Sequence, residues 1–343
     1  IGDSLRETIL NENIELLISN KIQPNALPNG FVPVDIDVTP MENSKSKKEG
    51  VSRTYKGFDG YAPMMAYIGT EGYAINFELR EGKQHCQNGT VEFLQETIRL
   101  CKKLTDQPLL VRLDSGNDSI DNVAVLIDAG CYFIIKRNLR RESKDGWFDM
   151  AKQYCKNITT PRDGKTVYVG SDWKDVCSKQ FEKEFTLRAG YEITERTVDK
   201  YGQILLIPEI EVETWWTNLG ATDEEIIQLY HAHGECEQFH SEIKTDMDLE
   251  RLPSGKFATN ALVLELGLIA YNILRMIGQG TIGGRAPRQK RNVKRRRLHT
   301  VISNLIMMAS HVTTHARQLV MGLGKSNVWR HLFADFCESS VAL

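Results

Sequence analysis

Two aspartates of this 343-residue chain stand where an apolar run ends, a position that favours metal binding. Asp37 lies at the end of the alternating run Val34–Val38, and Asp114 directly follows the apolar run Leu109–Leu113. Ligands of α/β sheets gather at such strand ends. If a third carboxylate, Glu237, joins them, the three charges repel one another unless cations neutralise them. Two Mg²⁺ ions about 3.5–4 Å apart would do so and would activate a water or a 3′-hydroxyl for attack on phosphorus.

The third carboxylate belongs to a helical pattern that opens at Asp223 and runs to about residue 244. Four side chains recur there at offsets of 3, 4 and 7, which at 3.6 residues per turn places them on one side of the helix: Tyr230, His233, Glu237 and Lys244. Such a face surrounds one acid with an aromatic ring, a hydrogen-bond donor and a cation, which suits a metal ion with a bound phosphate. A solvated helix with scattered charge has the same spacing.

Apolar periodicity predicts the elements that bring these acids together. In chain order they are a helical segment within 1–30, a strand at 34–38, a hairpin of 62–68 and 73–79, a helix at 90–105, a strand at 109–113, a helix at 119–129 and a strand at 131–136. Three antiparallel strands followed by βαβ units predict a mixed α/β sheet of the ribonuclease H type. In that sheet the first and fourth strands are neighbours, so Asp37 and Asp114 meet, and a helix over this edge adds Glu237.

The other segments predict an insertion and a helical C-terminal part. We expect an N-terminal helical segment at 1–30, a catalytic core at 31–139 and 211–278, an inserted antiparallel β unit at 140–210, and a basic helical region at 279–343. Within these parts the patterns predict a loop at 42–60, a strand returning to the core at 211–218, a buried helix at 257–277, and final helices at about 299–321 and 326–337.

The net charge of −2 conceals a strong asymmetry along the chain. Residues 280–343 contain 11 Lys and Arg against 2 Asp and Glu, whereas the remaining residues contain 32 against 43. Eight of the cations fall within 13 residues: Arg285, Arg288, Lys290, Arg291, Lys294, Arg295, Arg296 and Arg297. This density predicts contacts with DNA phosphates that do not read sequence and weaken as salt rises. A nuclear localisation signal has the same composition.

Composition excludes several classes of protein. Hydrophobic residues make up 41% and charged residues 26% of the chain, which is typical of a globular protein and not of a collagen, a coiled coil or a disordered chain. The seven cysteines include no CxxC pair, which favours reduced thiols in the cytoplasm. The apolar stretch 258–277 contains Asn260, Glu265 and Arg275, so we expect a buried helix and no membrane span. Because the chain begins with Ile, we expect a piece of a longer protein.

Three short motifs, taken in order, resemble a known family. Asp37-Val-Thr39, Leu113-Asp114-Ser-Gly and Tyr230-x2-His233-x3-Glu237-x6-Lys244 are similar to the DDE transposases of bacterial insertion sequences. The likeness is to the branch with a β-strand insertion between the second Asp and the Glu, and within it to the group numbered thirteen-eighty. The segments 251–257 and 270–274 also resemble that group, so the likeness covers roughly residues 31–278.

The resemblance implies roles for individual residues. Asp37, Asp114 and Glu237 would hold two Mg²⁺ ions, for which Mn²⁺ can substitute, while Tyr230 and Lys244 would contact DNA phosphates. The family has Arg where this chain has His233, which keeps a hydrogen-bond donor but loses the fixed charge and the planar fork. The motif selects Asp37 as the first acid over Asp35, its rival on the same side of the strand. A tryptophan of the insertion would receive a flipped base, with Trp173, Trp215 and Trp216 as candidates.

The function implied by the resemblance is transposition. The protein would cut double-stranded DNA at transposon ends and join the 3′-hydroxyl ends to target DNA, as a homodimer because two ends must be held at once. Such an enzyme would lie in the bacterial cytoplasm, on the nucleoid. Two alternatives stay open: a non-catalytic DNA-binding protein derived from a transposase, which His233 favours, and a Mg²⁺-dependent nuclease without strand transfer.

Overall fold

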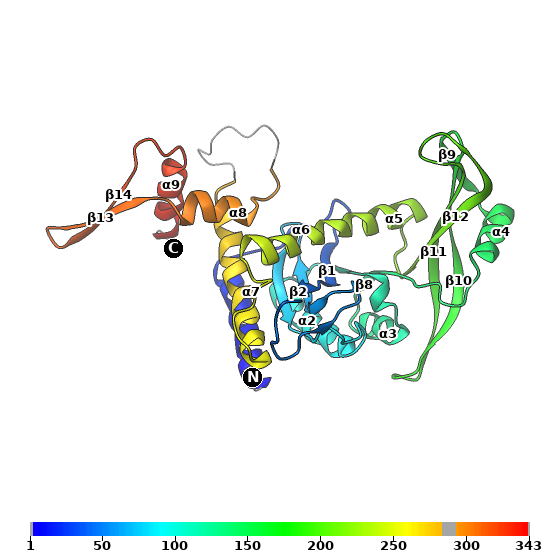
Figure 1. Ribbon diagram of the computed structural model, residues 1–343, viewed down its shortest axis with the longest axis horizontal. Coiled ribbons are helices and arrows are strands. Elements are labelled where there is room, and N and C mark those ends of the chain that lie inside the picture. The colour runs from blue at the N-terminus through cyan, green and yellow to red at the C-terminus, as the bar shows by residue number, and fades with distance from the viewer. Residues whose placement is uncertain (1–2, 283–292, 342–343) are drawn as a thin grey trace.

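A nine-stranded mixed sheet forms the centre of the computed structural model, which describes residues 3–282 and 293–341 (Figure 1). The first half of the sheet contains β1 (Val32–Val38), β5 (Met64–Ile68), β6 (Tyr73–Glu78), β7 (Leu109–Leu113) and β8 (Tyr132–Lys136). Their order across the sheet is β6-β5-β1-β7-β8, with β5 antiparallel to β1 and with β7 and β8 parallel to it. This order and these directions are those of the ribonuclease H fold, so the predicted fold class is confirmed.

The two faces of this sheet are covered by different helices. Val111 and Phe133 point into the main core, which includes the helices α2 (Thr90–Leu104) and α3 (Ile120–Asp128). Leu110 and Ile134 point the other way, into a smaller apolar cluster formed with α5 (Asp223–His231). Because side chains alternate along a strand, the even-numbered residues of β7 and the odd-numbered residues of β1 lie on the α5 side. The sequence thereby places polar side chains on one face only.

The chain between β8 and α5 extends the same sheet. It contributes α4 (Lys144–Tyr154), β9 (Asn157–Arg162), β10 (Lys165–Ser178), β11 (Lys183–Val198) and β12 (Ile204–Thr217). The last three residues of β12 pair antiparallel with β8, so the predicted strand returning to the core is confirmed. The long strands stand as a blade at one end of the molecule, with α4 on their outer side (Figure 1). The sequence patterns missed α4, whose Trp147 packs on Tyr191 with ring centroids 5.7 Å apart.

A helical stretch of four segments follows the blade and crosses the core above β1 (Figure 1). It consists of α5, a 3-10 turn η2 (Ala232–Glu235), α6 (Cys236–Ser241) and a π-helical turn η3 (Glu242–Asp246). A capping box fixes its start, since Thr222 Oγ1 accepts from Glu225 N and Glu225 Oε2 accepts from Thr222 N. The predicted helix from 223 to about 244 is confirmed in extent, although it is not a regular α-helix.

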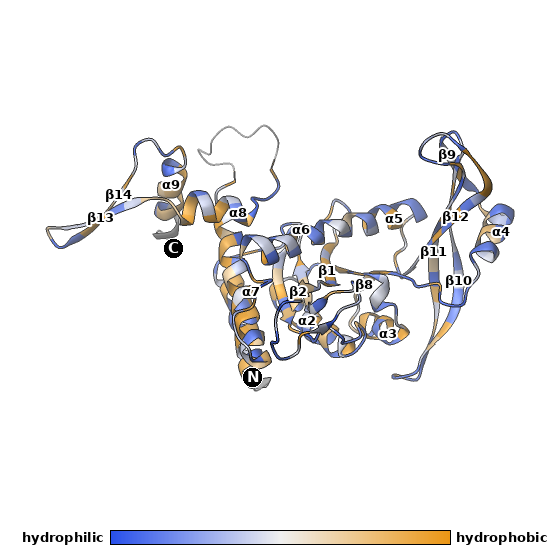
Figure 2. Ribbon diagram, in the orientation of Figure 1, coloured by the Kyte–Doolittle hydropathy of each residue, from blue (hydrophilic) through white to orange (hydrophobic). Residues whose placement is uncertain are grey.

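The helix α7 (Phe257–Gly280) packs against β6 and against α1 (Asp3–Ser19). Figure 2 shows apolar residues concentrated along α7. Among the described residues it is the one helix long and apolar enough to cross a membrane by length and composition. It nevertheless buries polar side chains that have partners in the protein: Asn272 exchanges hydrogen bonds of 2.8 and 2.7 Å with the backbone of Ala74. This is the behaviour of a core helix, as the sequence predicted.

Two predicted elements differ from the structure. The expected loop at 42–60 contains most of a small three-stranded sheet of β2 (Met41–Glu42), β4 (Asp59–Tyr61) and β3 (Ser52–Arg53), whose strands are too short to show a period. The expected helix at 299–321 is wrong beyond residue 306. After α8 (Leu298–Val301) and a π-helical turn η4 (Ile302–Ile306), the chain forms a hairpin of β13 (Ser310–His315) and β14 (Gln318–Leu323) before α9 (Arg330–Val341).

The residues of the β13–β14 hairpin explain why a hairpin forms where a helix was expected. Val312, Thr313 and Thr314 are β-branched and favour strands over helices. Ala316 and Arg317 both have positive φ, at 48° and 64°, which is the backbone of a two-residue type I′ turn. Such turns usually contain Asn-Gly, so this one carries no recognisable sequence signal.

Candidate active site

The three predicted acids line one cavity of about 450 Å³ on the α5 side of the sheet. Asp37 comes from β1, Asp114 directly follows β7, and Glu237 comes from α6. The two strands are parallel neighbours, with Ile36 paired to Leu113, so their ends bring the first two carboxylates together. The other lining residues are Tyr55, Lys56, Tyr230, His231, His233, Gly234 and Cys236.

The cavity concentrates negative charge. Burial and, after it, the charge of Asp114 raise the pKa of Asp37 to about 6, against the opposing effects of His233, the Val38 amide and Lys56. The Val38 N–H donates to Asp37 Oδ1 at 2.7 Å, and Asn117 Nδ2 donates to Asp114 Oδ1 at 2.7 Å. These few donors leave carboxylate oxygens open toward the cavity, as a site for cations requires.

The raised pKa predicts how Asp37 affects the stability of the metal-free protein. The folded protein holds the proton of the Asp37 carboxyl more tightly than the unfolded chain does. The stability that this proton contributes is therefore complete below the ordinary pKa of 3.8 and is lost as pH rises to about 6. Above pH 6 the folded protein therefore carries the full penalty of the charge, about 3 kcal/mol at most. We expect Asp37→Asn to raise the melting temperature of the metal-free protein at pH 7.5.

The same melting experiment at pH 4 is the control for Asp37→Asn. Wild type and variant should converge there, because the wild-type carboxyl is then largely protonated in the folded state. A variant that melts below wild type at pH 7.5, measured with a chelator present, would contradict the predicted repulsion.

Asp35, the rival first acid, is bound inside the protein. Arg112 donates to it through a two-pronged pair, Nε to Oδ1 at 2.6 Å and Nη2 to Oδ2 at 2.7 Å. His233 Nδ1 lies 2.9 Å from the same Oδ1, and since a carboxylate only accepts, this nitrogen carries the proton. Burial raises the pKa of Asp35, but the charges of Arg112 and His233 outweigh it and hold that pKa below the ordinary value. Asp35 therefore acts as an internal counter-ion, outside the cavity lining.

His233 consequently has a structural partner. It is 8% exposed, lines the cavity, and connects the helical stretch to β1 through Asp35. Arg112 makes a second link, because its Nη1 donates to the carbonyl of Leu229 on α5 at 2.7 Å. The Arg112–Asp35–His233 network joins both acid-bearing strands to the helix that carries Glu237.

The carboxylate oxygens that line the cavity are the ligands that hard divalent cations prefer. Within the described part of the chain, no group of three His, Cys, Asp or Glu side chains converges closely enough to hold one ion by itself. The three carboxylates thus fit ions whose remaining ligands come from water and from phosphate oxygens, which is how Mg²⁺ is usually bound. A zinc-type cage of four protein ligands does not fit.

Two cavity residues came from the segment predicted to be a loop. Tyr55 and Lys56 lie in the turn between β3 and β4, and Tyr55 Oη donates to the carbonyl of Val38 at 3.4 Å. The charge of Lys56 lowers the pKa of Asp37. Nothing in the local sequence distinguishes Lys56 from the other lysines of this segment. Tyr230, which was predicted, also lines the cavity, and its pKa is raised by burial and by Asp114 and Asp37, so its hydroxyl remains a neutral donor.

The other predicted DNA-binding residues are distributed differently. Lys244 is absent from the cavity lining, and its Nζ donates to Pro40 O at 2.7 Å and lies 3.3 Å from Glu250 Oε1. Arg288, Lys290 and Arg291, with Arg285, lie outside the described residues. Lys294 is exposed, whereas Arg295, Arg296 and Arg297 contact groups of the protein itself.

The three candidate tryptophans separate by exposure. Trp215 is fully buried beside Tyr230, and Trp216 is 4% exposed, donates from Nε1 to Asp118 Oδ1 at 3.0 Å and stacks under Arg137. Trp173 is 64% exposed on β10. It is paired in register with Arg188, whose side chain contacts Asp223 at the start of α5, so both side chains lie on the α5 side of the sheet.

A family model described as Transposase DDE domain group 1 matches residues 6–340. No curated protein matches the chain. Among solved structures, the cryo-EM structure of piggyBac transposase in a synaptic complex with hairpin DNA is similar, at 13% sequence identity and a TM-score of 0.39. The match covers 80% of this chain and 53% of that chain, so this chain corresponds to about half of its length.

Proposed function

This chain belongs to the family of DDE transposases described as Transposase DDE domain group 1, and we propose that it cuts DNA at transposon ends and joins the 3′-hydroxyl ends to target DNA. The observation that supports this most directly is the shared cavity of Asp37, Asp114 and Glu237, which come from two neighbouring strands and the helix above them. Both reactions are phosphoryl transfers, and the same acids would serve each of them in turn.

The residues of the cavity divide into roles. Asp37, Asp114 and Glu237 would hold two Mg²⁺ ions, or Mn²⁺ as a substitute, and these ions would stabilise the leaving oxygen and lower the pKa of the attacking water or hydroxyl. Lys56 and the hydroxyl of Tyr230 would donate to phosphate oxygens at the cut. His233 would hold the helix through Asp35 and contribute its second ring nitrogen to the cavity. Trp173 is the candidate for receiving a flipped base, because the other two tryptophans are enclosed in the core.

The partners follow from the reaction. We propose that double-stranded DNA binds across the cavity, that Lys244, Lys294 and the basic residues Arg288, Lys290 and Arg291 add phosphate contacts, and that two copies work together on two transposon ends. A bacterial cytoplasmic enzyme on the nucleoid, from the branch with the β insertion, is consistent with the thirteen-eighty-like motifs. The charge asymmetry of the chain supports a polyanionic partner at its C-terminal end.

A strand-transfer assay with pre-cut transposon ends tests the proposal. We expect labelled 3′-hydroxyl ends to become joined to a target plasmid in the presence of Mg²⁺, and Glu237→Gln to abolish joining while leaving the protein folded. Cutting of uncut ends without any joined product would instead identify a nuclease. Binding without either reaction would identify a non-catalytic DNA-binding protein and refute the proposal.

A further inference from the structure

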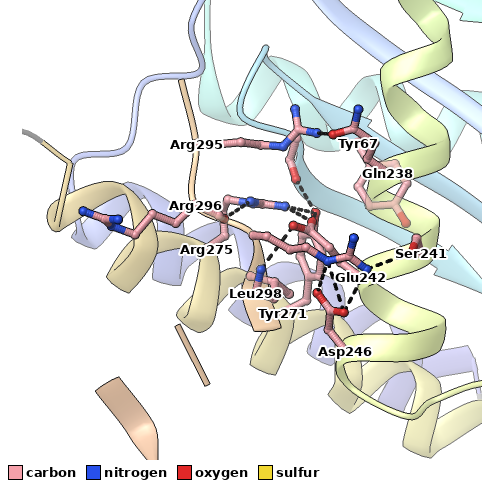
Figure 3. Close-up of polar contacts among 12 residues, drawn as sticks. Tyr67, Gln238, Ser241, Glu242, Asp246, Tyr271, Arg275, Arg295, Arg296 and Leu298 are labelled. Carbon is pink, nitrogen blue, oxygen red and sulfur yellow. Dashed lines mark hydrogen bonds and ion pairs between the residues drawn. The ribbon is translucent and has the colours of Figure 1, made fainter. Parts of the chain in front are cut away.

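A short basic segment lies along the helix that carries Glu237. We call residues 294–299 the strap; it includes the first two residues of α8 and contains half of the dense basic run. Figure 3 shows its side chains and backbone meeting Gln238, Glu242 and Asp246. The basic run was predicted to contact DNA. Strap cations that are already paired with side chains of the protein would serve a structural role, whereas unpaired cations stay available to DNA.

Two arginines of the strap hold polar side chains of the helix. Arg297 Nε and Nη2 donate to the two carboxylate oxygens of Asp246 at 2.9 and 3.0 Å, and Nη2 also donates to Ser241 Oγ at 3.1 Å. Arg295 donates to Gln238 Oε1, and its Nη1 lies 3.7 Å from Glu235 Oε2. Asp246 has a side chain only 3% exposed, so its charge depends on Arg297 for compensation.

The backbone of the strap is held as well. Leu298 N donates to Glu242 Oε1 at 3.2 Å, and Arg275 Nη1 donates to the Arg296 carbonyl at 3.0 Å (Figure 3). Glu242 and Arg275 form a buried ion pair with each other, at 2% and 0% exposure, and Tyr271 of α7 accepts from Arg275 at 2.7 Å. The strap thus takes part in a hydrogen-bond network that joins η3, at the end of the helical stretch, to α7.

Most of the helix residues that the strap contacts lie on one side of the helix. Residues 235, 238, 242 and 246 are spaced by 3, 4 and 4, so they recur on one face, whereas Ser241, which also accepts from Arg297, follows Glu237 by about one turn. At 100° per residue that face is turned well away from Glu237, which remains exposed and directed at the cavity. Two of the contacted residues are close to Glu237 in the chain: Glu235 lies two positions before it and Gln238 directly follows it. A strap bound there fixes the rotation of the helix and leaves the side chain of Glu237 uncovered.

We propose that the strap is a positioning device for Glu237 and that Arg295 and Arg297 are positioning residues, with their charges directed to the helix and not to DNA. The inference rests on the proposed function, because Glu237 is there a metal ligand. It divides the predicted DNA-binding run: Lys294 is exposed and has no side-chain partner among the residues that the structure describes, so it remains available to phosphates. A DNA role for Arg297 would require Asp246 to give up its counter-ion.

A charge exchange tests the proposal in the full chain. We expect Arg297→Glu to lower Mn²⁺ affinity, measured by electron paramagnetic resonance without DNA, by about 10-fold or more, as loss of an outer support of a metal ligand does. The cleavage rate at subsaturating Mn²⁺ should fall in parallel, while the Kd for DNA stays within about twofold. The double variant Asp246→Lys with Arg297→Glu restores the pair in reverse and should recover most of the Mn²⁺ affinity.

Lys294→Glu is the matched control, with the same charge change three residues away. It should leave Mn²⁺ affinity unchanged, weaken DNA binding, and reduce the log–log salt slope by about 0.9. If Arg297→Glu instead behaves like Lys294→Glu, Arg297 is a DNA ligand and the strap proposal fails. If the Glu variant does not fold, Arg297→Gln removes the charge and the two-pronged contact with Asp246 more mildly, and Mn²⁺ affinity equal to that of wild type would overturn the proposal. Wild-type protein that binds Mn²⁺ but cuts no DNA would refute the function, while the Mn²⁺ affinities still decide the role of the strap.

Discussion

Asp37→Ala, Asp114→Ala and Glu237→Ala are each expected to reduce cleavage at transposon ends by about 1,000-fold or more, because each removes charge that would hold the ions stabilising the transition state. DNA binding should persist, since phosphate contacts are made elsewhere on the protein. The measurement is single-turnover cleavage of pre-bound DNA, with Kd determined separately in Ca²⁺ or chelator.

A change of metal distinguishes loss of a ligand from general damage. Asp114→Cys places a softer thiolate at the same position, so activity should be recovered more with Mn²⁺ than with Mg²⁺. Asp175→Ala, which removes an acid on β10 that does not line the cavity, is a matched control and should cut normally. Normal cleavage by Glu237→Ala would eliminate Glu237 from the site.

Asp35→Ala is expected to have the opposite phenotype: a large loss of stability with cleavage largely retained. It leaves the Arg112 guanidinium, 3% exposed, without its counter-ion, and breaking a buried pair from one side costs about 3–5 kcal/mol. The free energy of unfolding should fall by that amount in urea denaturation, and the melting temperature should fall with it. Below that temperature, cleavage should remain within about tenfold of wild type, because Asp35 does not line the cavity.

Asp35 and Asp37 form a matched pair, since they lie two residues apart on the same face of β1. One variant should lose stability and keep chemistry, and the other should lose chemistry and keep stability. An Asp35→Ala protein that folds as well as wild type but does not cut, beside an active Asp37→Ala protein, would reverse the assignment of the first acid.

The sequence was sufficient to predict the elements that carry the acids. β1 and β7 are short apolar runs in which the polar residues all fall on one face, so periodicity placed Asp37 and Asp114 at strand ends. The order of the elements predicted that the two strands are neighbours, and the family resemblance selected Asp37 over Asp35. The helix of Glu237 has an acidic first turn and a capping box, which are local signals. Spacing did not show that the stretch contains 3-10 and π-helical turns, the second of which begins at Glu242, a partner of the strap.

Long-range pairing explains what the sequence could not reveal. Arg297 and Asp246 are 51 residues apart, and Arg112 and Asp35 are 77 apart, so no local window contains both members of either pair. A basic run therefore has the same appearance whether its partners are phosphates or carboxylates of the same chain. Tyr55 and Lys56 were missed for a related reason, since strands of two or three residues are too short to show a period.

The order of the acids along the chain has a consequence for a protein being made on a ribosome. Asp37 and Asp114 lie on strands that can pair early, but Glu237 follows a long insertion and the strap comes later still. At about 5–20 residues per second, the interval between synthesis of Asp114 and of Glu237 is roughly 6–25 s. Throughout that time the nascent chain has two of its three carboxylates and no completed site. A nascent chain on the ribosome would thus be unable to cut nearby DNA, and the activity would appear only after the strap has been translated.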